Sequence, residues 1–354
     1  MTMKAGSLAL LILTLCACGG GSGGASAGTA AASSSASSSS VKVAADYAYG
    51  ADIGWVSQEE SLGFAFNDAS GVRADPFELL KGYGINAIRL RVWVDPKGGW
   101  NGRDDTLAKA LRARAHGQKV MIDFHYSDDW ADPGKQYKPA AWASHSVDQL
   151  KADVYAHTRD TLAYLKANGV DVAWVQVGNE ITNGLLWPDG KSDHFDNLTA
   201  FTNSGYDAVK SVYPGAAVVI HIDNGWDTAK AEWWFDNYAA HGGKVDIIGL
   251  SYYPAYTPSK DWRIEAPKIS TTMTELVGRY HKPLMVVETG FQYDQPAEAK
   301  AMLSDLIRRN QALGDMGLGV FYWEPDTIQS WTHYPLGAMD TSNRFTAAME
   351  AFRH

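Results

Sequence analysis

Short apolar runs alternate with longer segments of helical periodicity from Tyr47 to the end of the chain. Between the short runs, apolar residues recur at intervals of three and four, which predicts helices at 75–83, 104–116, 147–168 and 296–313. A glycine follows each of these segments, as is common at helix C-termini. The short runs are rich in β-branched residues and predict eight strands: 49–55, 86–94, 119–126, 172–180, 216–224, 246–254, 283–291 and 317–324.

Eight strands that alternate with helices in one continuous domain are typical of a (β/α)8 barrel, the TIM barrel. The alternative is a doubly wound open sheet, which commonly carries a nucleotide site. However, no G-x-G-x-x-G motif opens a helix after a predicted strand, and no P-loop lysine motif is present. We therefore predict an α/β fold with a single barrel that spans residues 46–354.

The first 45 residues differ from this domain. Residues 1–18 contain one lysine, a short apolar run and the ending Leu15-Cys16-Ala17-Cys18, which predicts a signal peptide with a bacterial lipobox and lipidation of Cys18. Residues 19–45 are rich in Gly, Ala and Ser and predict a flexible linker. We therefore expect export and a membrane-anchored lipoprotein at the periplasm or the cell surface. The alternative is an ordinary cleaved signal peptide and a secreted protein.

Composition narrows the choice of partners. The net charge is −9 and no compact basic stretch is present, which argues against duplex nucleic acid as a partner. The chain contains 13 Trp and 17 Tyr, and flat aromatic rings suit the apolar C–H faces of sugars. Both cysteines precede residue 19, so the predicted barrel has no disulfide. We expect a monomer that binds a polysaccharide and contacts a membrane only through its lipid anchor.

Polar residues gather at the ends of the predicted strands, where barrel enzymes place their catalytic groups. Glu180 ends the fourth predicted strand and Glu288 ends the seventh. An ionised carboxylate beside such apolar runs is unfavourable unless it is paired or functional. The two strands lie across the barrel mouth from each other, so both side chains can face one ligand. Two facing carboxylates suit glycoside hydrolysis, in which one protonates the leaving oxygen and the other acts at the anomeric carbon.

The motifs at these positions resemble known glycosidases. Asn179-Glu180 at the end of one strand, with Glu288 ending another, is similar to the clan A retaining glycosidases. The wider resemblance runs from about residue 49 to the C-terminus and is to the endo-β-1,4-galactanases of glycoside hydrolase family 53. The segments that carry it are 50–53, 84–93, 123–136, 175–184 and 186–190.

The resemblance implies roles for individual residues. Glu180 would be the acid/base and Glu288 the nucleophile of a retaining double displacement. Asn179 would bind the 2-hydroxyl of the sugar at subsite −1, and Trp323 would form the floor of that subsite. Arg89 would lie beneath the nucleophile and keep it ionised. The other residues expected to bind substrate along the cleft are His125, Asp128, Trp130, His221, Asn224, Tyr252, Tyr253 and Trp331.

We expect no cofactor and no metal. In some bacterial members of the family, the loop after the seventh strand is long, acidic and binds calcium. Here residues 289–296 contain one acidic residue, Asp294, which is fewer oxygen ligands than calcium prefers. The expected substrate is β-1,4-galactan, including the type I arabinogalactan side chains of pectin.

Other functions remain open from the sequence. A second clan A polysaccharide hydrolase, such as a mannanase, xylanase or cellulase, would have the same catalytic pair. A non-catalytic surface lipoprotein that binds polysaccharide would keep the aromatic residues but has no need of both Glu180 and Glu288. A metal-dependent barrel hydrolase is disfavoured, because no H-x-H motif follows the first predicted strand.

Overall fold

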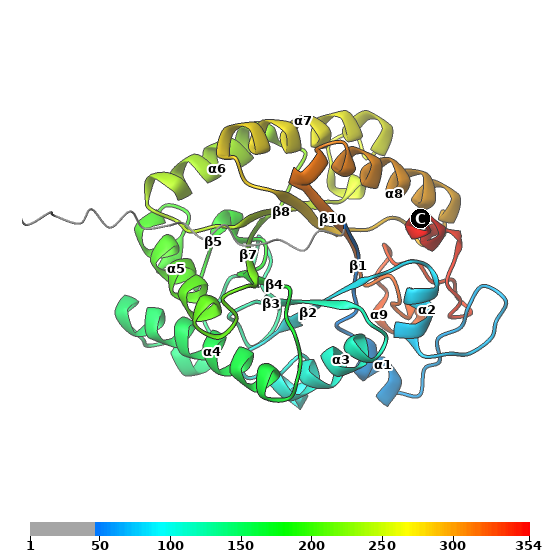
Figure 1. Ribbon diagram of the computed structural model, residues 1–354, viewed down its shortest axis with the longest axis horizontal. Helices are drawn as coiled ribbons and strands as arrows, with labels where there is room; N and C mark the ends of the chain where they lie inside the picture. The colour runs from blue at the N-terminus through cyan, green and yellow to red at the C-terminus, as the bar shows by residue number, and fades with distance from the viewer. Residues whose placement is uncertain (1–46) are drawn as a thin grey trace, which may run out of the picture. The chain divides into compact units, whose positions relative to one another are not determined.

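The computed structural model describes residues 47–354 (Figure 1). The predicted signal peptide, the lipidation site Cys18 and the linker 19–45 lie outside the described residues. None of the described helices combines the length and the hydropathy needed to span a bilayer.

Eight parallel strands form a closed barrel, because β1 pairs with β10 as well as with β2. Each predicted strand is confirmed, and the predicted ranges are longer because they include the loop residues that follow. In order around the barrel the strands are β1 (Ala48–Asp52), β2 (Ala87–Val92), β3 (Lys119–Phe124), β4 (Trp174–Val177), β7 (Ala217–Ile222), β8 (Ile247–Tyr252), β9 (Leu284–Thr289) and β10 (Gly317–Trp323).

Helices surround this ring of strands, and all four predicted helices are confirmed (Figure 1). A short antiparallel hairpin in the loop after β4, formed by β5 (Gly184–Leu185) and β6 (Gly190–Lys191), was not predicted. The α-helices are α1 (Val56–Ser61), α2 (Pro76–Gly82), α3 (Arg103–Ala115), α4 (Val147–Ala167), α5 (Phe195–Val212), α6 (Thr228–Ala240), α7 (Trp262–Tyr280), α8 (Pro296–Gln311) and α9 (Gln329–Thr332). The 3-10 helices are Lys97–Gly99, Ala140–Trp142, Ile181–Asn183, Pro254–Tyr256, Gly314–Met316 and Ala347–Phe352.

Helix α4 illustrates how local sequence sets these elements. The Ser146 side chain accepts a hydrogen bond from the backbone N–H of Gln149, and the Gln149 side chain accepts one from the backbone N–H of Ser146, which forms a capping box. The helix stops before Gly169, whose φ of 78° suits a residue without a Cβ. One face of the helix is buried against the barrel, and its buried residues are Leu150, Val154, Thr158, Thr161, Leu162 and Leu165.

The lower part of the barrel interior is a small apolar core. The rings of Trp174 and Phe321 meet edge to face there, with centroids 6.4 Å apart. A Cβ on Gly50 would lie 2.1 Å from the Phe321 ring, so this position has room only for glycine. The buried residues of this core are Ala48, Ala87, Met121, Trp174, Ala217, Val219, Ile247, Met285, Val287 and Phe321.

Alternate residues of each strand point into the barrel, and above this core the inward residues are polar. Asp52, Arg89, Asp123 and His221 are fully buried there. Strand β9 departs from the alternation. Leu250 of β8 pairs with Val286 and Ser251 pairs with Glu288, so β9 contains one extra residue at this point, a β-bulge.

Candidate active site

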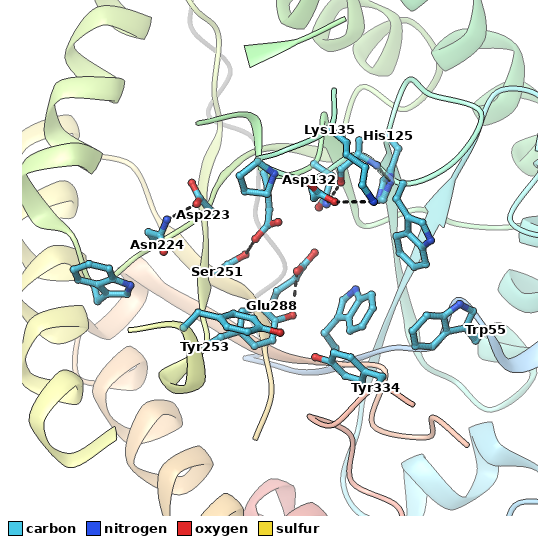
Figure 2. Close-up of a pocket in the computed structure, with 18 residues that line it drawn as sticks. Trp55, His125, Asp132, Lys135, Asp223, Asn224, Ser251, Tyr253, Glu288 and Tyr334 are labelled. Carbon is cyan, nitrogen blue, oxygen red and sulfur yellow. Dashed lines mark hydrogen bonds and ion pairs between the residues drawn. The ribbon is translucent and has the colours of Figure 1, made fainter. Parts of the chain in front are cut away.

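A cavity of about 570 Å³ opens at the C-terminal ends of the barrel strands (Figure 2). It contains both carboxylates that were singled out from the sequence, and aromatic rings make up much of its wall. Its lining residues are Trp55, His125, Trp130, Ala131, Asp132, Pro133, Lys135, Asn179, Glu180, Asp223, Asn224, Trp226, Ser251, Tyr253, Tyr256, Glu288, Trp323 and Tyr334.

The two carboxylates reach this cavity because the backbone is irregular at both positions. Val287 belongs to the apolar core of the barrel, so strict alternation would turn the next residue outward. The bulge in β9 instead brings Glu288 to the cavity. Glu180 follows β4 with φ 47° and ψ 50°, a left-handed conformation that is uncommon for a residue with a side chain.

Glu288 is held by two donors. The Arg89 guanidinium lies 2.9 Å from its Oε1, and the Tyr253 hydroxyl donates to its Oε2 at 3.1 Å, a contact visible in Figure 2. The pKa of Glu288 is raised to about 7. Burial is the largest cause, and Asp52 and Asp123 also raise the pKa, while Arg89 and Tyr253 lower it. Arg89 and Tyr253 therefore favour the ionised form of Glu288 against the effect of burial.

The surroundings of Glu180 favour its protonated form. Burial raises the pKa of Glu180 well above its usual value, and the negative charges of Glu288, Asp223 and Asp132 raise it further. The Ser251 hydroxyl donates to Oε1 of Glu180 at 2.6 Å and partly offsets this effect. Glu288 thus contacts a guanidinium, whereas Glu180 is surrounded by negative charges, and such a difference in environment suits acid–base chemistry at one bond.

Arg89 connects the site to the barrel interior. Its guanidinium is fully buried and contacts Asp52 at 2.5 Å and Asp123 at 2.9 Å as well as Glu288. It also donates to Oδ1 of Asn179 at 2.8 Å. The Asn179 amide nitrogen donates to the Ala131 carbonyl at 2.9 Å, so the side chain is fixed on both sides.

Aromatic rings pack around a second buried arginine at one end of the cavity. The Arg91 guanidinium lies 4.4 Å from the Trp130 ring centroid and 5.3 Å from that of Trp55. It forms an ion pair with Glu324, the residue after Trp323. Neither Nε nor Nη2 of Arg91 has a hydrogen-bond partner within residues 47–354, so the ring faces provide their main polar contact.

Most of the predicted substrate-binding residues reach the cavity wall. His125, Trp130, Asn179, Asn224, Tyr253 and Trp323 line the cavity. Arg89 lies directly behind Glu288, as expected. For each of these residues, contact with a sugar remains a prediction.

Four predicted residues lie elsewhere. Tyr252 is 1% exposed and packs in the core between strands and helices, because its neighbours Ser251 and Tyr253 take the two inward positions, so its placement in the cleft was wrong. His221 is fully buried and does not line the cavity, and its contact with a sugar stays a prediction.

The other two residues, Asp128 and Trp331, support loops. Asp128 does not line the cavity, since its carboxylate accepts from the backbone nitrogens of Asp95 and Ala140 at 3.0 and 2.8 Å. Trp331 packs partly buried beside Trp55, at a centroid distance of 6.3 Å. Its stacking on a distal sugar stays a prediction.

Several residues that line the cavity were not predicted from the sequence. Trp55 and Tyr334 come from loops far apart in the chain. Their rings lie 6.1 Å apart, and both contact Trp323, at 5.2 and 4.8 Å. Ser251 could have been found, because strand alternation places it on the same face as Tyr253. The other missed residues with polar or aromatic side chains are Asp132, Lys135, Asp223, Trp226 and Tyr256.

No group of three or more His, Cys, Asp or Glu side chains within the described range 47–354 is arranged to hold a metal ion. Of the carboxyl groups that line the cavity, Glu180 and Glu288 are the two that the sequence singled out, and a tyrosine, an arginine and a set of aromatic rings surround them. A pair of carboxyl groups at the mouth of a (β/α)8 barrel is the arrangement that glycoside hydrolases use.

Comparison with known proteins assigns the family. The sequence pattern of glycosyl hydrolase family 53 matches residues 48–352, so the chain belongs to this family. The probable arabinogalactan endo-β-1,4-galactanase A of Neosartorya fischeri is 36% identical over 312 residues, which cover 81% of this chain and 86% of the relative.

Two solved structures of the family agree with this assignment. A fungal β-1,4-galactanase superposes with a TM-score of 0.81 at 30% identity, covering 87% of this chain and 99% of the other. The family 53 catalytic domain of Ignisphaera aggregans gives a TM-score of 0.80 at 30% identity, covering 89% and 97%. The resemblance found in the sequence motifs and the predicted TIM barrel are therefore confirmed.

Proposed function

We propose that this glycosidase is an endo-β-1,4-galactanase that cleaves galactan by double displacement, with Glu288 as nucleophile and Glu180 as acid/base. The names of its relatives support the activity and the substrate class. The observation that carries the assignment of roles is the contrast between the two carboxyl groups. Glu288 is bound by Arg89 and Tyr253, which favour its ionised form, while burial and nearby negative charges raise the pKa of Glu180 and favour its protonated form.

In the first step, a carboxylate oxygen of Glu288 attacks the anomeric carbon of the galactose at subsite −1. The bond between that carbon and the glycosidic oxygen breaks as Glu180 donates its proton to this oxygen. The products are a covalent galactosyl-enzyme and a shortened chain with a new hydroxyl group.

In the second step, Glu180, now ionised, removes a proton from a water molecule as the water oxygen attacks the anomeric carbon. The ester bond to Glu288 breaks and its carboxylate is regenerated. Two inversions at the same carbon give a product with retained β configuration.

The wall of the cavity would position the sugars around this bond. Trp323 would support the ring at subsite −1, with Asn179 bound to its 2-hydroxyl. Trp55 and Trp130, which contact Trp323, would extend this surface toward the further minus subsites. Pyranose C–H faces pack well on such rings, while the hydroxyl groups remain available to polar side chains.

We further propose that the natural substrate is the type I arabinogalactan of pectin, and that the enzyme is exported and anchored by a lipid on Cys18. Arabinogalactan is the polysaccharide in the names of the relatives, which supports this substrate. The anchor is supported by the sequence pattern before residue 19. Radiolabelled palmitate incorporation that disappears in Cys18→Ala would test the anchor.

The assay compares wild type, Glu180→Gln and Glu288→Gln on linear β-1,4-galactan, mannan, xylan and carboxymethyl-cellulose. We expect reducing-sugar release from galactan by wild type alone. NMR during early hydrolysis should show the β anomer first. Preferential hydrolysis of mannan, xylan or cellulose would favour another clan A activity, and an α product would exclude double displacement.

A further inference from the structure

Two buried residues behind Glu180 form a closed set of hydrogen bonds with it. The Ser251 hydroxyl lies 2.6 Å from Oε1 of Glu180, a contact drawn in Figure 2, and 2.8 Å from Nε2 of His221. The other ring nitrogen of His221, Nδ1, lies 3.3 Å from the backbone nitrogen of Glu180. His221 is fully buried and Ser251 is 2% exposed, so bulk water does not compete for these contacts.

The direction of these hydrogen bonds follows from the chemistry of each group when Glu180 is ionised. A carboxylate oxygen only accepts, so the single Ser251 hydrogen must point to Oε1 of Glu180. The Ser251 oxygen then accepts from His221, which places the imidazole proton on Nε2. Nδ1 is left with a lone pair, and the backbone N–H of Glu180 points at it.

This assignment requires a neutral imidazole, and the surroundings of His221 supply that condition. Burial lowers the pKa of His221 well below its usual value, and the positive charge of Arg89 lowers it further, against an opposing effect of Asp123. His125 acts in the same direction as Arg89. Oδ1 of Asn179 also lies 3.0 Å from Nδ1, but it already accepts from Arg89 and from Gln176.

We propose that Ser251 and His221 are positioning residues that keep Oε1 of Glu180 as a hydrogen-bond acceptor, so that the catalytic proton is carried by Oε2. The proposal rests on the proposed role of Glu180 as acid/base. The same pair holds the side chain of Glu180 through Ser251 and its left-handed backbone through His221. One carboxyl oxygen is thereby reserved for the proton that moves to the leaving group and returns from water.

The first test removes the hydroxyl group. Ser251→Ala should lower kcat on galactan by about 10- to 100-fold, the effect of losing one hydrogen bond to a charged group. KM should change little, because Ser251 supports Glu180 and not the sugar. Ser251→Thr retains the hydroxyl and should recover most of the activity.

The pH profile separates positioning from general damage. Ser251 stabilises the ionised form of Glu180, so its loss raises the pKa of that group. Glu180 must be protonated to act as the acid, and the alkaline limb of kcat/KM in Ser251→Ala should therefore move to higher pH. Thr202→Val is the matched control, because it removes another fully buried hydroxyl, bonded to Tyr238 on the outer helices, and should leave the limb in place.

The tautomer of His221 is a test that needs no activity. In ¹⁵N-labelled wild type, with His221 assigned by its loss in His221→Gln, the nitrogen shifts should report a neutral ring protonated at Nε2. A ring protonated at Nδ1, or an imidazolium, near neutral pH would overturn the proposal. This measurement also tests the proposed positioning role if Ser251→Ala does not fold.

Glu180→Gln keeps failure of this proposal separate from failure of the proposed function. If Glu180→Gln is as active as wild type, Glu180 is not the acid/base and the proposed function is wrong. If Glu180→Gln is inactive while Ser251→Ala keeps the wild-type kcat and pH profile, only the positioning role is wrong. An equal shift of the alkaline limb in Thr202→Val would also refute that role.

Discussion

The hydrogen bond from Tyr253 to Glu288 offers the sharpest test of how the site sets its ionisation. The hydroxyl donates to Oε2 at 3.1 Å and lowers the pKa of Glu288, which is about 7 with this hydrogen bond in place and is raised mainly by burial. Tyr253→Phe removes this donor and leaves the ring in place. Because Glu288 is only 5% exposed, water does not readily replace the lost hydrogen bond.

The size of the effect follows from the strength of that hydrogen bond. A hydrogen bond to a charged group contributes about 1.5–3 kcal/mol, and about 1.4 kcal/mol corresponds to a tenfold change in acidity. The pKa of Glu288 in Tyr253→Phe should therefore rise by roughly 1 to 2. Since the nucleophile must be ionised, kcat/KM at pH 7 should fall roughly 5- to 50-fold.

The assay is the pH dependence of kcat/KM on linear galactan. The acid limb should move to higher pH in Tyr253→Phe, and activity should recover in part as the pH is raised. Tyr252→Phe is the matched control, because the neighbouring hydroxyl is buried on the opposite side of β8 and has no hydrogen-bond partner among the described residues. An unchanged acid limb in Tyr253→Phe would refute the reasoning.

Three further predictions concern packing, binding and stability. Arg91→Met leaves Glu324 buried without its cation and should lower the free energy of unfolding by about 3–5 kcal/mol. Urea titrations measure this change, and a loss below ~1 kcal/mol would contradict the prediction. Trp226→Ala should raise KM for galactan more than it lowers kcat, because Trp226 lines the cavity with an aromatic ring and has no group that could take part in proton transfer, and an unchanged KM would count against that role. Glu59 and Asp326 are fully buried, and burial raises both pKa values, that of Glu59 to about 8. The charge of Glu324 raises both further, and the charge of Glu59 also raises the pKa of Asp326. A carboxyl group whose pKa is raised in the folded state contributes stability that is lost as the pH rises through that pKa. Wild type should therefore lose stability between pH 6 and 9, and Asp326→Asn should lose less. Equal losses would argue against this role of Glu59 and Asp326.

The sequence by itself determined the barrel. The eight apolar runs and the four amphipathic segments predicted correspond to elements of the structure, because strand and helix periodicity is a local property of the chain. It also singled out Glu180 and Glu288, since carboxylates that end apolar runs are conspicuous without any knowledge of the fold. The family motifs added residues such as Asn179 and Trp323, which do line the cavity.

The direction of side chains near the strand ends was decided only by the tertiary structure. The inward position of Glu288 depends on a bulge that is defined by pairing with β8, and no local pattern in β9 announces it. The same dependence explains why Tyr252 faces the outer core while Tyr253 faces the cavity. His221 sits on an inward position as predicted, but the side chains of Glu180 and Ser251 cover it. Periodicity reports which residues are apolar, whereas register, bulges and the packing of distant loops determine which polar atoms meet.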